Sequence, residues 1–148
     1  MADTVAFERS HHILIDTPAQ AVYDYVTNPN TWPEWIAASH HIDCPDRPLR
    51  KGETFEEKWQ TRAEVLLRWT VLESVPHRLW VATADTDFIG PIVVQYTFEP
   101  AGDATRYTRT VRNPARPKAP TPEMIARIDA EAQTALQNIK RNVEARAR

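Results

Sequence analysis

Glycine and cysteine are scarce in this chain of 148 residues. Only Gly52, Gly90 and Gly102 occur, so neither a phosphate-binding loop nor the three-glycine dinucleotide motif can be assembled. The single cysteine, Cys44, excludes an internal disulfide and any zinc or redox site built from paired cysteines. The sequence therefore excludes these kinds of nucleotide and metal chemistry, and we expect a cytoplasmic protein.

Long apolar runs are also absent. No stretch approaches the roughly 20 apolar residues that span a bilayer, and the first residues lack the basic and apolar segments of a secretory signal. Apolar residues make up 42% of the chain and charged residues 26%, a composition typical of a soluble globular protein. We expect one domain, residues 1–148, without membrane insertion and without a cofactor.

Charge is unevenly distributed along the chain. The net charge is −2, yet residues 101–148 carry ten basic and five acidic side chains. The acidic residues are interleaved with the basic ones, which is typical of a solvated helix face. We therefore expect no nucleic-acid partner.

The order of apolar segments and turn residues predicts an α+β domain. A strand over residues 7–15 leads directly into a short helix, and a helical turn near residues 32–36 follows. Turn residues then recur at strand-like intervals, which predicts about six more strands up to residue 111. The connections are too short for parallel crossovers, so the sheet is predicted to be antiparallel.

The last part of the chain predicts a long amphipathic helix. The proline-rich segment 113–120 is expected to break regular structure, and Thr121 is expected to cap the helix that follows. Apolar residues then recur at spacings of three and four: Ile125, Ile128, Ala132, Ala135, Leu136, Ile139 and Val143. We expect one face of the sheet to be buried against this helix.

Several segments carry a family resemblance when they are taken in order. They are ILIDTPAQAVY (13–23), NPNTWPEW (28–35), LRKGETF (49–55), RWTVLE (68–73) with Pro76, and YTFEPAGDATR (96–106). Together they resemble the START-like, or polyketide cyclase/dehydrase (SRPBCC), superfamily of helix-grip proteins, over nearly the whole chain. The resemblance implies a curved seven-stranded antiparallel sheet wrapped around the C-terminal helix, with two short helices between the first two strands. It also implies an apolar cavity that binds ligands, with catalysis in only some members.

Strand periodicity predicts which side chains line that cavity. Alternate residues of a strand face one side, so the more apolar set of each strand is assigned to the cavity wall. The predicted ligand-binding residues are Trp35, Phe55, Glu57, Trp59, Leu67, Trp69, Val81, Thr83, Phe98, Ile125 and Ile128. The candidate catalytic residues among the inward rows are His11, Tyr96, Tyr107 and Arg109.

The polar candidates each allow two interpretations. Arg109 either holds a ligand carboxylate or enolate, for which its planar fork is suited, or has no ligand. In the second case it forms an internal ion pair with Glu57, or its end of the strand is exposed to water. Tyr96 and Tyr107 donate either to a ligand carbonyl or to a protein acceptor. The tryptophans either stack on an aromatic ligand or fill the core.

The histidines are the remaining candidates for proton transfer and for metal binding. His11 is the best candidate for a general base, because its ordinary pKa lies near neutrality. His11 and His12, and likewise His40 and His41, are adjacent in the sequence and would point to opposite faces of a strand. Neither pair can chelate a metal by itself, and we expect no metal site.

The leading functional interpretation is a monomer or homodimer that binds a small hydrophobic or aromatic ligand in the cavity, resembling a polyketide cyclase/dehydrase. Whether it is an enzyme remains open. One alternative is a lipid or quinone carrier. Another is a non-catalytic interaction module, co-chaperone-like or ribosome-associated, whose contact surface would be Lys140, Arg141, Arg146 and Arg148.

Overall fold

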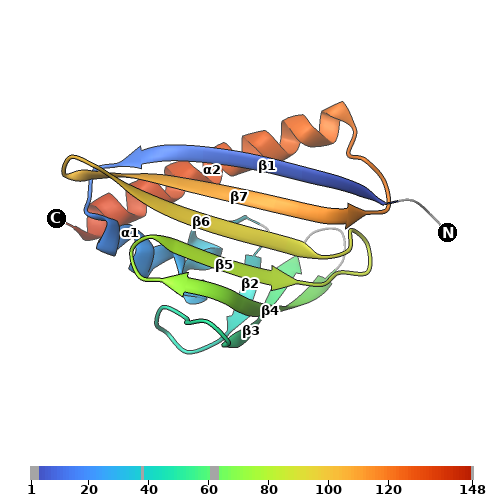
Figure 1. Ribbon diagram of the computed structural model, residues 1–148, viewed down its shortest axis with the longest axis horizontal. Coiled ribbons are helices and arrows are strands. Elements are labelled where there is room, and N and C mark those ends of the chain that lie inside the picture. The colour runs from blue at the N-terminus through green and yellow to red at the C-terminus, as the bar shows by residue number, and fades with distance from the viewer. Residues whose placement is uncertain (1–3, 38, 61–63, 148) are drawn as a thin grey trace.

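The computed structural model describes residues 4–37, 39–60 and 64–147 (Figure 1). Within them, seven strands form one antiparallel sheet in the order β1-β7-β6-β5-β4-β3-β2. The elements are β1 (Val5–Ile15), α1 (Ala19–Val26), the 3-10 helix η1 (Pro29–Glu34), β2 (Ser39–Asp43), β3 (Thr54–Gln60), β4 (Glu64–Val75), β5 (Leu79–Ala84), β6 (Ile92–Ala101), β7 (Ala104–Arg116) and α2 (Pro122–Arg146). The predicted α+β helix-grip fold is therefore confirmed.

The C-terminal helix α2 lies along the sheet next to β1 (Figure 1). Thr121 caps it as predicted, because its hydroxyl oxygen accepts a hydrogen bond from the Met124 backbone N–H at 3.2 Å. The buried residues of the helix begin at its eleventh residue: Ala132, Ala135, Leu136, Ile139 and Val143. Residues 122–131 include no fully buried side chain, so this part of α2 is packed less closely against the sheet.

Aromatic side chains fill much of the interior. Trp32 of η1 makes edge-to-face contacts with Phe55, at 5.3 Å between ring centroids, and with Trp69, at 5.6 Å. Trp80 stacks on Tyr96 with centroids 5.3 Å apart. This arrangement gives the sheet a large apolar inner face, which is the face that packs against the helices.

The predicted break at residue 113 is wrong, because β7 continues to Arg116. The register between β1 and β7 shifts between Val5 and Phe7, opposite residues 114 and 115. A bulge of this kind leaves a residue outside the hydrogen-bonded ladder. Pro114 has no N–H to donate, so it is tolerated at that position.

The predicted orientation of β5 is also wrong. Trp80, Ala82 and Ala84 are buried, whereas Val81 and Thr83 are only half-buried and lie on the opposite face of the sheet. The inward-facing row of β5 contains two alanines, so in the sequence it looks less apolar than the outward-facing row. Their small size leaves room for neighbouring rings, because Ala84 lies directly opposite Trp69 on β4.

No helix in the described part of the chain combines the length and apolarity needed to cross a membrane.

Candidate functional site

Polar side chains gather on the inner face of the sheet, among the aromatic residues. Tyr96 of β6 lies directly opposite Arg109 of β7, and Tyr107 precedes Arg109 by two residues on the same face. On the other side of the interior, Glu57 and Trp59 of β3 occupy the inner row of their strand, and Ser39 of β2 lies opposite Trp59. We call Ser39, Glu57, Trp59, Tyr96, Tyr107 and Arg109 the polar cluster.

Each member of the polar cluster has a buried polar atom without a hydrogen-bond partner among the described residues. These atoms are Ser39 Oγ, Glu57 Oε2, Trp59 Nε1, Tyr96 OH, Tyr107 OH and Arg109 Nε. An unsatisfied buried polar atom costs about 1–3 kcal/mol, and native interiors contain few of them. A concentration of such atoms in one part of the interior is therefore typical of a site that binds a polar ligand.

Glu57 is the most deeply buried carboxyl group of the site, at 1% exposure. Its Oε1 accepts one hydrogen bond from Trp69 Nε1 at 3.0 Å. Burial raises the pKa of Glu57, although Ser39, Trp69, Trp59 and the positive charge of Arg109 lie close enough to oppose that shift.

The internal ion pair between Glu57 and Arg109, one of the expectations for Arg109, does not form. Glu57 Oε2 and Arg109 Nε are both without a partner in the described structure. The guanidinium carbon of Arg109 instead lies 5.7 Å from the centroid of the Trp35 ring, a cation–π distance. Arg109 is therefore half-buried beside an aromatic ring and forms no ion pair with any of the described residues.

The two tyrosines remain hydrogen-bond donors near neutral pH. Their rings meet edge to face with centroids 5.7 Å apart. Burial raises the pKa of Tyr96 to about 12, against the opposing effect of the Arg109 charge. Burial likewise raises the pKa of Tyr107 well above its ordinary value. Both hydroxyls are therefore available to donate to an oxygen atom in the interior.

His11 lies at the edge of the polar cluster, directly opposite Arg109 on β1. Its Nε2 is 2.8 Å from Asp129 Oδ1 of α2. The same carboxylate accepts hydrogen bonds from Arg9 Nε at 3.0 Å and from Arg9 Nη2 at 2.5 Å. A carboxylate in this position orients an imidazole ring and leaves its second nitrogen free to exchange protons.

Asp129 was missed by the sequence analysis, although a signal was present. It lies four residues after Ile125 and three before Ala132, so it belongs to the apolar stripe of the helix. A charged residue on an apolar stripe indicates a partner on the facing element.

The apolar candidates divide into three groups. Phe55, Leu67, Trp69 and Phe98 are enclosed in the core, and the aromatic members contact other rings. Trp59, Ile125 and Ile128 are half-buried, the isoleucines on the first half of α2. Val81 and Thr83 lie on the outer face and cannot line the interior.

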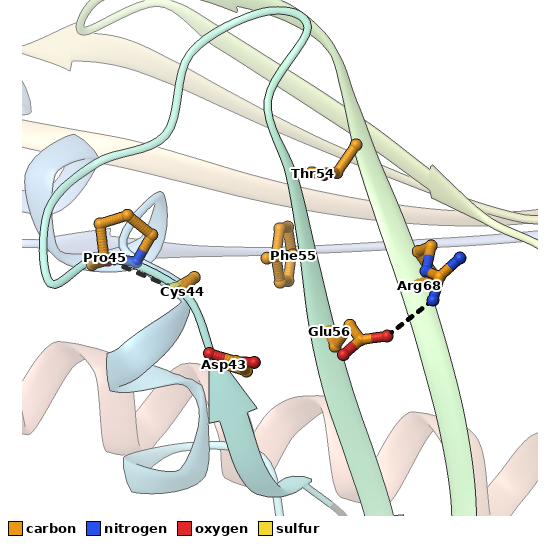
Figure 2. A pocket seen from close by; sticks show the side chains of 7 residues that line it. All are labelled: Asp43, Cys44, Pro45, Thr54, Phe55, Glu56 and Arg68. Atoms are coloured by element: carbon orange, nitrogen blue, oxygen red, sulfur yellow. Dashed lines mark hydrogen bonds and ion pairs between the residues drawn. The ribbon is translucent and has the colours of Figure 1, made fainter.

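A surface groove of about 420 Å³ lies apart from the polar cluster, beside β2, β3 and β4 (Figure 2). Its lining residues are Asp43, Cys44, Pro45, Thr54, Phe55, Glu56 and Arg68. Glu56 and Arg68 form an ion pair of 3.0 Å across it. Burial raises the pKa of the Cys44 thiol to about 11, so it is a poor nucleophile near neutral pH. The groove is therefore a weaker candidate for a functional site than the polar cluster.

Comparisons with known proteins agree with this architecture. The family model described as polyketide cyclase/dehydrase and lipid transport matches residues 5–144. Penitrem biosynthesis cluster 1 protein I of Penicillium ochrochloron is 34% identical over 130 residues, which is 82% of this chain and 84% of that protein.

Two solved structures share the fold at low sequence identity. The Zhui aromatase/cyclase from a Streptomyces species has a TM-score of 0.73 at 13% identity and covers 97% of each chain. The di-domain ARO/CYC StfQ from the steffimycin biosynthetic pathway has a TM-score of 0.75 at 14% identity, over 96% of this chain and 52% of that chain. At such identities these structures support the helix-grip architecture alone.

Proposed function

Because this chain belongs to the polyketide cyclase/dehydrase and lipid transport family, we propose that it binds a small hydrophobic or aromatic molecule that carries oxygen atoms, in the interior between the sheet and α2. The observation that carries the proposal is the polar cluster, whose buried polar atoms lack partners within the described chain. Ligand pockets are typically apolar concavities with a few polar groups that fix orientation. The polar cluster and its aromatic surroundings supply the polar and apolar groups of such a site.

Each polar group has a defined part in the proposed binding. The hydroxyls of Tyr96 and Tyr107 donate hydrogen bonds to ligand oxygens, and Arg109 supplies a positive charge close to them. Trp35, which covers Arg109, supplies an apolar wall. The ligand thereby satisfies atoms whose burial would otherwise cost about 1–3 kcal/mol each.

The same arrangement supports a cyclase-like role. In ring closures of the aldol type, negative charge develops on a carbonyl oxygen, where donors such as the two tyrosines and Arg109 stabilise it. His11, oriented by Asp129, is the base in this proposal. The biosynthetic role in the name of the fungal relative adds support to this proposal.

The alternative of an interaction module has weaker support. Lys140 donates to the Leu14 carbonyl oxygen and pairs with Glu144. Arg146 pairs with Glu34, Arg141 Nη2 donates to Asn138, and Arg148 lies outside the described residues. Three of the four basic residues of the supposed contact surface are thus engaged within the chain.

Native mass spectrometry of the protein as isolated tests the proposal directly. We expect a co-purified small molecule, and extraction distinguishes a lipid or quinone from an aromatic compound. In parallel, a fluorescent apolar probe is titrated into the wild type, Tyr96→Phe and Arg109→Gln. Arg112→Gln is the matched control, because Arg112 lies on the same strand but pairs with Glu8 on the outer face.

We expect weaker probe binding only for the two interior variants. Unchanged binding by folded Tyr96→Phe and Arg109→Gln would show that the site lies elsewhere. Absence of both a co-purified molecule and probe binding would overturn the proposed function itself.

A further inference from the structure

We propose that the interior site selects a ligand with a single negative charge: a carboxylate, phenolate or enolate. The negative group pairs with Arg109. Glu57 serves as a neutral carboxylic acid that donates a hydrogen bond to a second polar group of the ligand. This inference rests on the proposed function and names the chemical class of its ligand.

The first argument is the balance of charge inside the site. Arg109 and Glu57 are the basic and the acidic residue of the polar cluster, and no hydrogen bond or ion pair joins them in the described structure. Asp129, which contacts the neighbouring His11, is already matched, because it accepts two hydrogen bonds from Arg9 and lies within hydrogen-bond distance of His11. Arg109 therefore forms no ion pair with a carboxylate of the described residues.

The second argument is the surroundings of Glu57. The residue is 1% exposed, and Trp69 donates a hydrogen bond to its carboxyl group. Ser39 and Trp59 lie nearby, but Ser39 Oγ and Trp59 Nε1 form no hydrogen bond in the described structure. A buried carboxylate is tolerated when several donors or a cation satisfy its oxygens, and it is costly otherwise. The neutral acid avoids this cost, and Oε2, which has no partner among the described residues, then carries a proton that a ligand can accept. The direction of the pKa shift at Glu57 agrees with this assignment.

The third argument is the chemistry of the groups beside Arg109. Tyr96 lies opposite it and Tyr107 is two residues away, and both are protonated phenols with unpartnered hydroxyls. Two neutral donors and one guanidinium are a typical set for an oxyanion, because every group in it donates. An uncharged ligand would leave the charge of the half-buried Arg109 without a bound counterion.

Two probes that differ in charge test this inference. 2-Naphthoate is an anion near neutral pH, and 2-naphthamide has nearly the same shape without the charge. We expect the wild-type protein to bind the naphthoate about tenfold or more tightly than the amide, as measured by calorimetry. Arg109→Gln is expected to abolish the preference, Arg109→Lys to retain part of it, and the control Arg112→Gln to keep it.

Glu57→Gln reports the charge of the carboxyl group. Glutamine imitates the neutral acid, so we expect naphthoate affinity to stay within about threefold of the wild type. The control is Glu56→Gln, which removes a carboxylate from the neighbouring outer position. If Glu57 were ionised in the wild type, removing its charge would raise naphthoate affinity about tenfold or more, and that result would overturn the inference.

The two proposals fail in different ways. Equal affinity of the wild type for the two probes overturns the anion preference and leaves small-molecule binding intact. Binding of neither naphthyl probe by the folded protein overturns the anion preference. The proposed function fails as well if the protein also carries no co-purified molecule and does not bind the fluorescent probe. Circular dichroism of each variant shows whether it is folded, and Arg109→Lys keeps the test decisive if Arg109→Gln does not fold.

Discussion

His11 on β1 and Asp129 on α2 lie 2.8 Å apart, from Nε2 to Oδ1, and this contact connects the sheet to residues 122–131 of the helix, which include no fully buried residue. Arg9 strengthens the connection through two further hydrogen bonds to the same carboxylate. Polar contacts therefore add to the partial burial of this part of α2, whereas full apolar burial begins at Ala132.

Replacing Asp129 with Ala is expected to loosen the first half of α2 without unfolding the domain. Amide hydrogen exchange followed by mass spectrometry should become faster over residues 122–131 and stay unchanged over residues 135–143. Glu131→Ala is the control, since Glu131 is an exposed residue of the same helix. Equal exchange in the two variants would show that packing alone holds this half.

The connection should also depend on pH. Arg9 and His11 lower the pKa of Asp129 below its ordinary value. A lowered pKa means that the stabilisation is present above the ordinary carboxyl pKa and is lost as the pH falls through the lowered value. We therefore expect the protection of amides 122–131 in the wild type, corrected for the intrinsic pH dependence of exchange, to fall in acid relative to residues 135–143. A profile matching that of Asp129→Ala would contradict this assignment.

Glu57 is expected to affect stability in the opposite sense. Burial raises its pKa, so its contribution is fully present below the ordinary pKa of glutamate and is lost as the pH rises through the raised value. In urea unfolding across this range, the wild type should lose stability with rising pH relative to Glu57→Gln. Parallel profiles for the two proteins would mean that the pKa of Glu57 is not raised.

Replacement of Trp80 tests the orientation of β5. Trp80 is fully buried, and its Nε1 donates to the Leu49 carbonyl oxygen at 3.0 Å. Trp80→Phe should lower the free energy of unfolding by about 2–3 kcal/mol, through lost packing and an unsatisfied carbonyl. Val81→Ala, on the half-buried outer face, should cost less than about 1 kcal/mol. The reverse order would support the orientation expected from the sequence.

Two glycines with positive φ angles offer a matched comparison. Gly90 has φ +72, and a Cβ atom there would lie 2.7 Å from the Ala115 carbonyl oxygen, whereas Gly52 has φ +90 and open space around it. Gly52→Ala should cost about 1 kcal/mol for the backbone conformation alone. Gly90→Ala should cost about 1–3 kcal/mol more, because the backbone must also move. Equal losses in thermal unfolding would show that the contact with Ala115 relaxes freely.

Part of the candidate site was predictable because strand periodicity is a local property. The alternation of Phe55, Glu57 and Trp59, and of Tyr107 and Arg109, correctly assigned these side chains to the inner face. The same reasoning failed on β5, where two alanines belong to the inner row. The apolar character of a single strand does not show whether large side chains of the neighbouring strands need space beside it.

The sequence by itself determined the order of the elements, the antiparallel sheet and the long helix, because turn residues, caps and the periods of strands and helices depend on neighbouring residues in the chain. Only the tertiary structure decided that Glu57 and Arg109 remain unpaired, that Asp129 connects α2 to β1, and that Trp80 faces inward. These outcomes depend on distances between residues that are far apart in the chain, and such distances are fixed only when the sheet and the helix pack together.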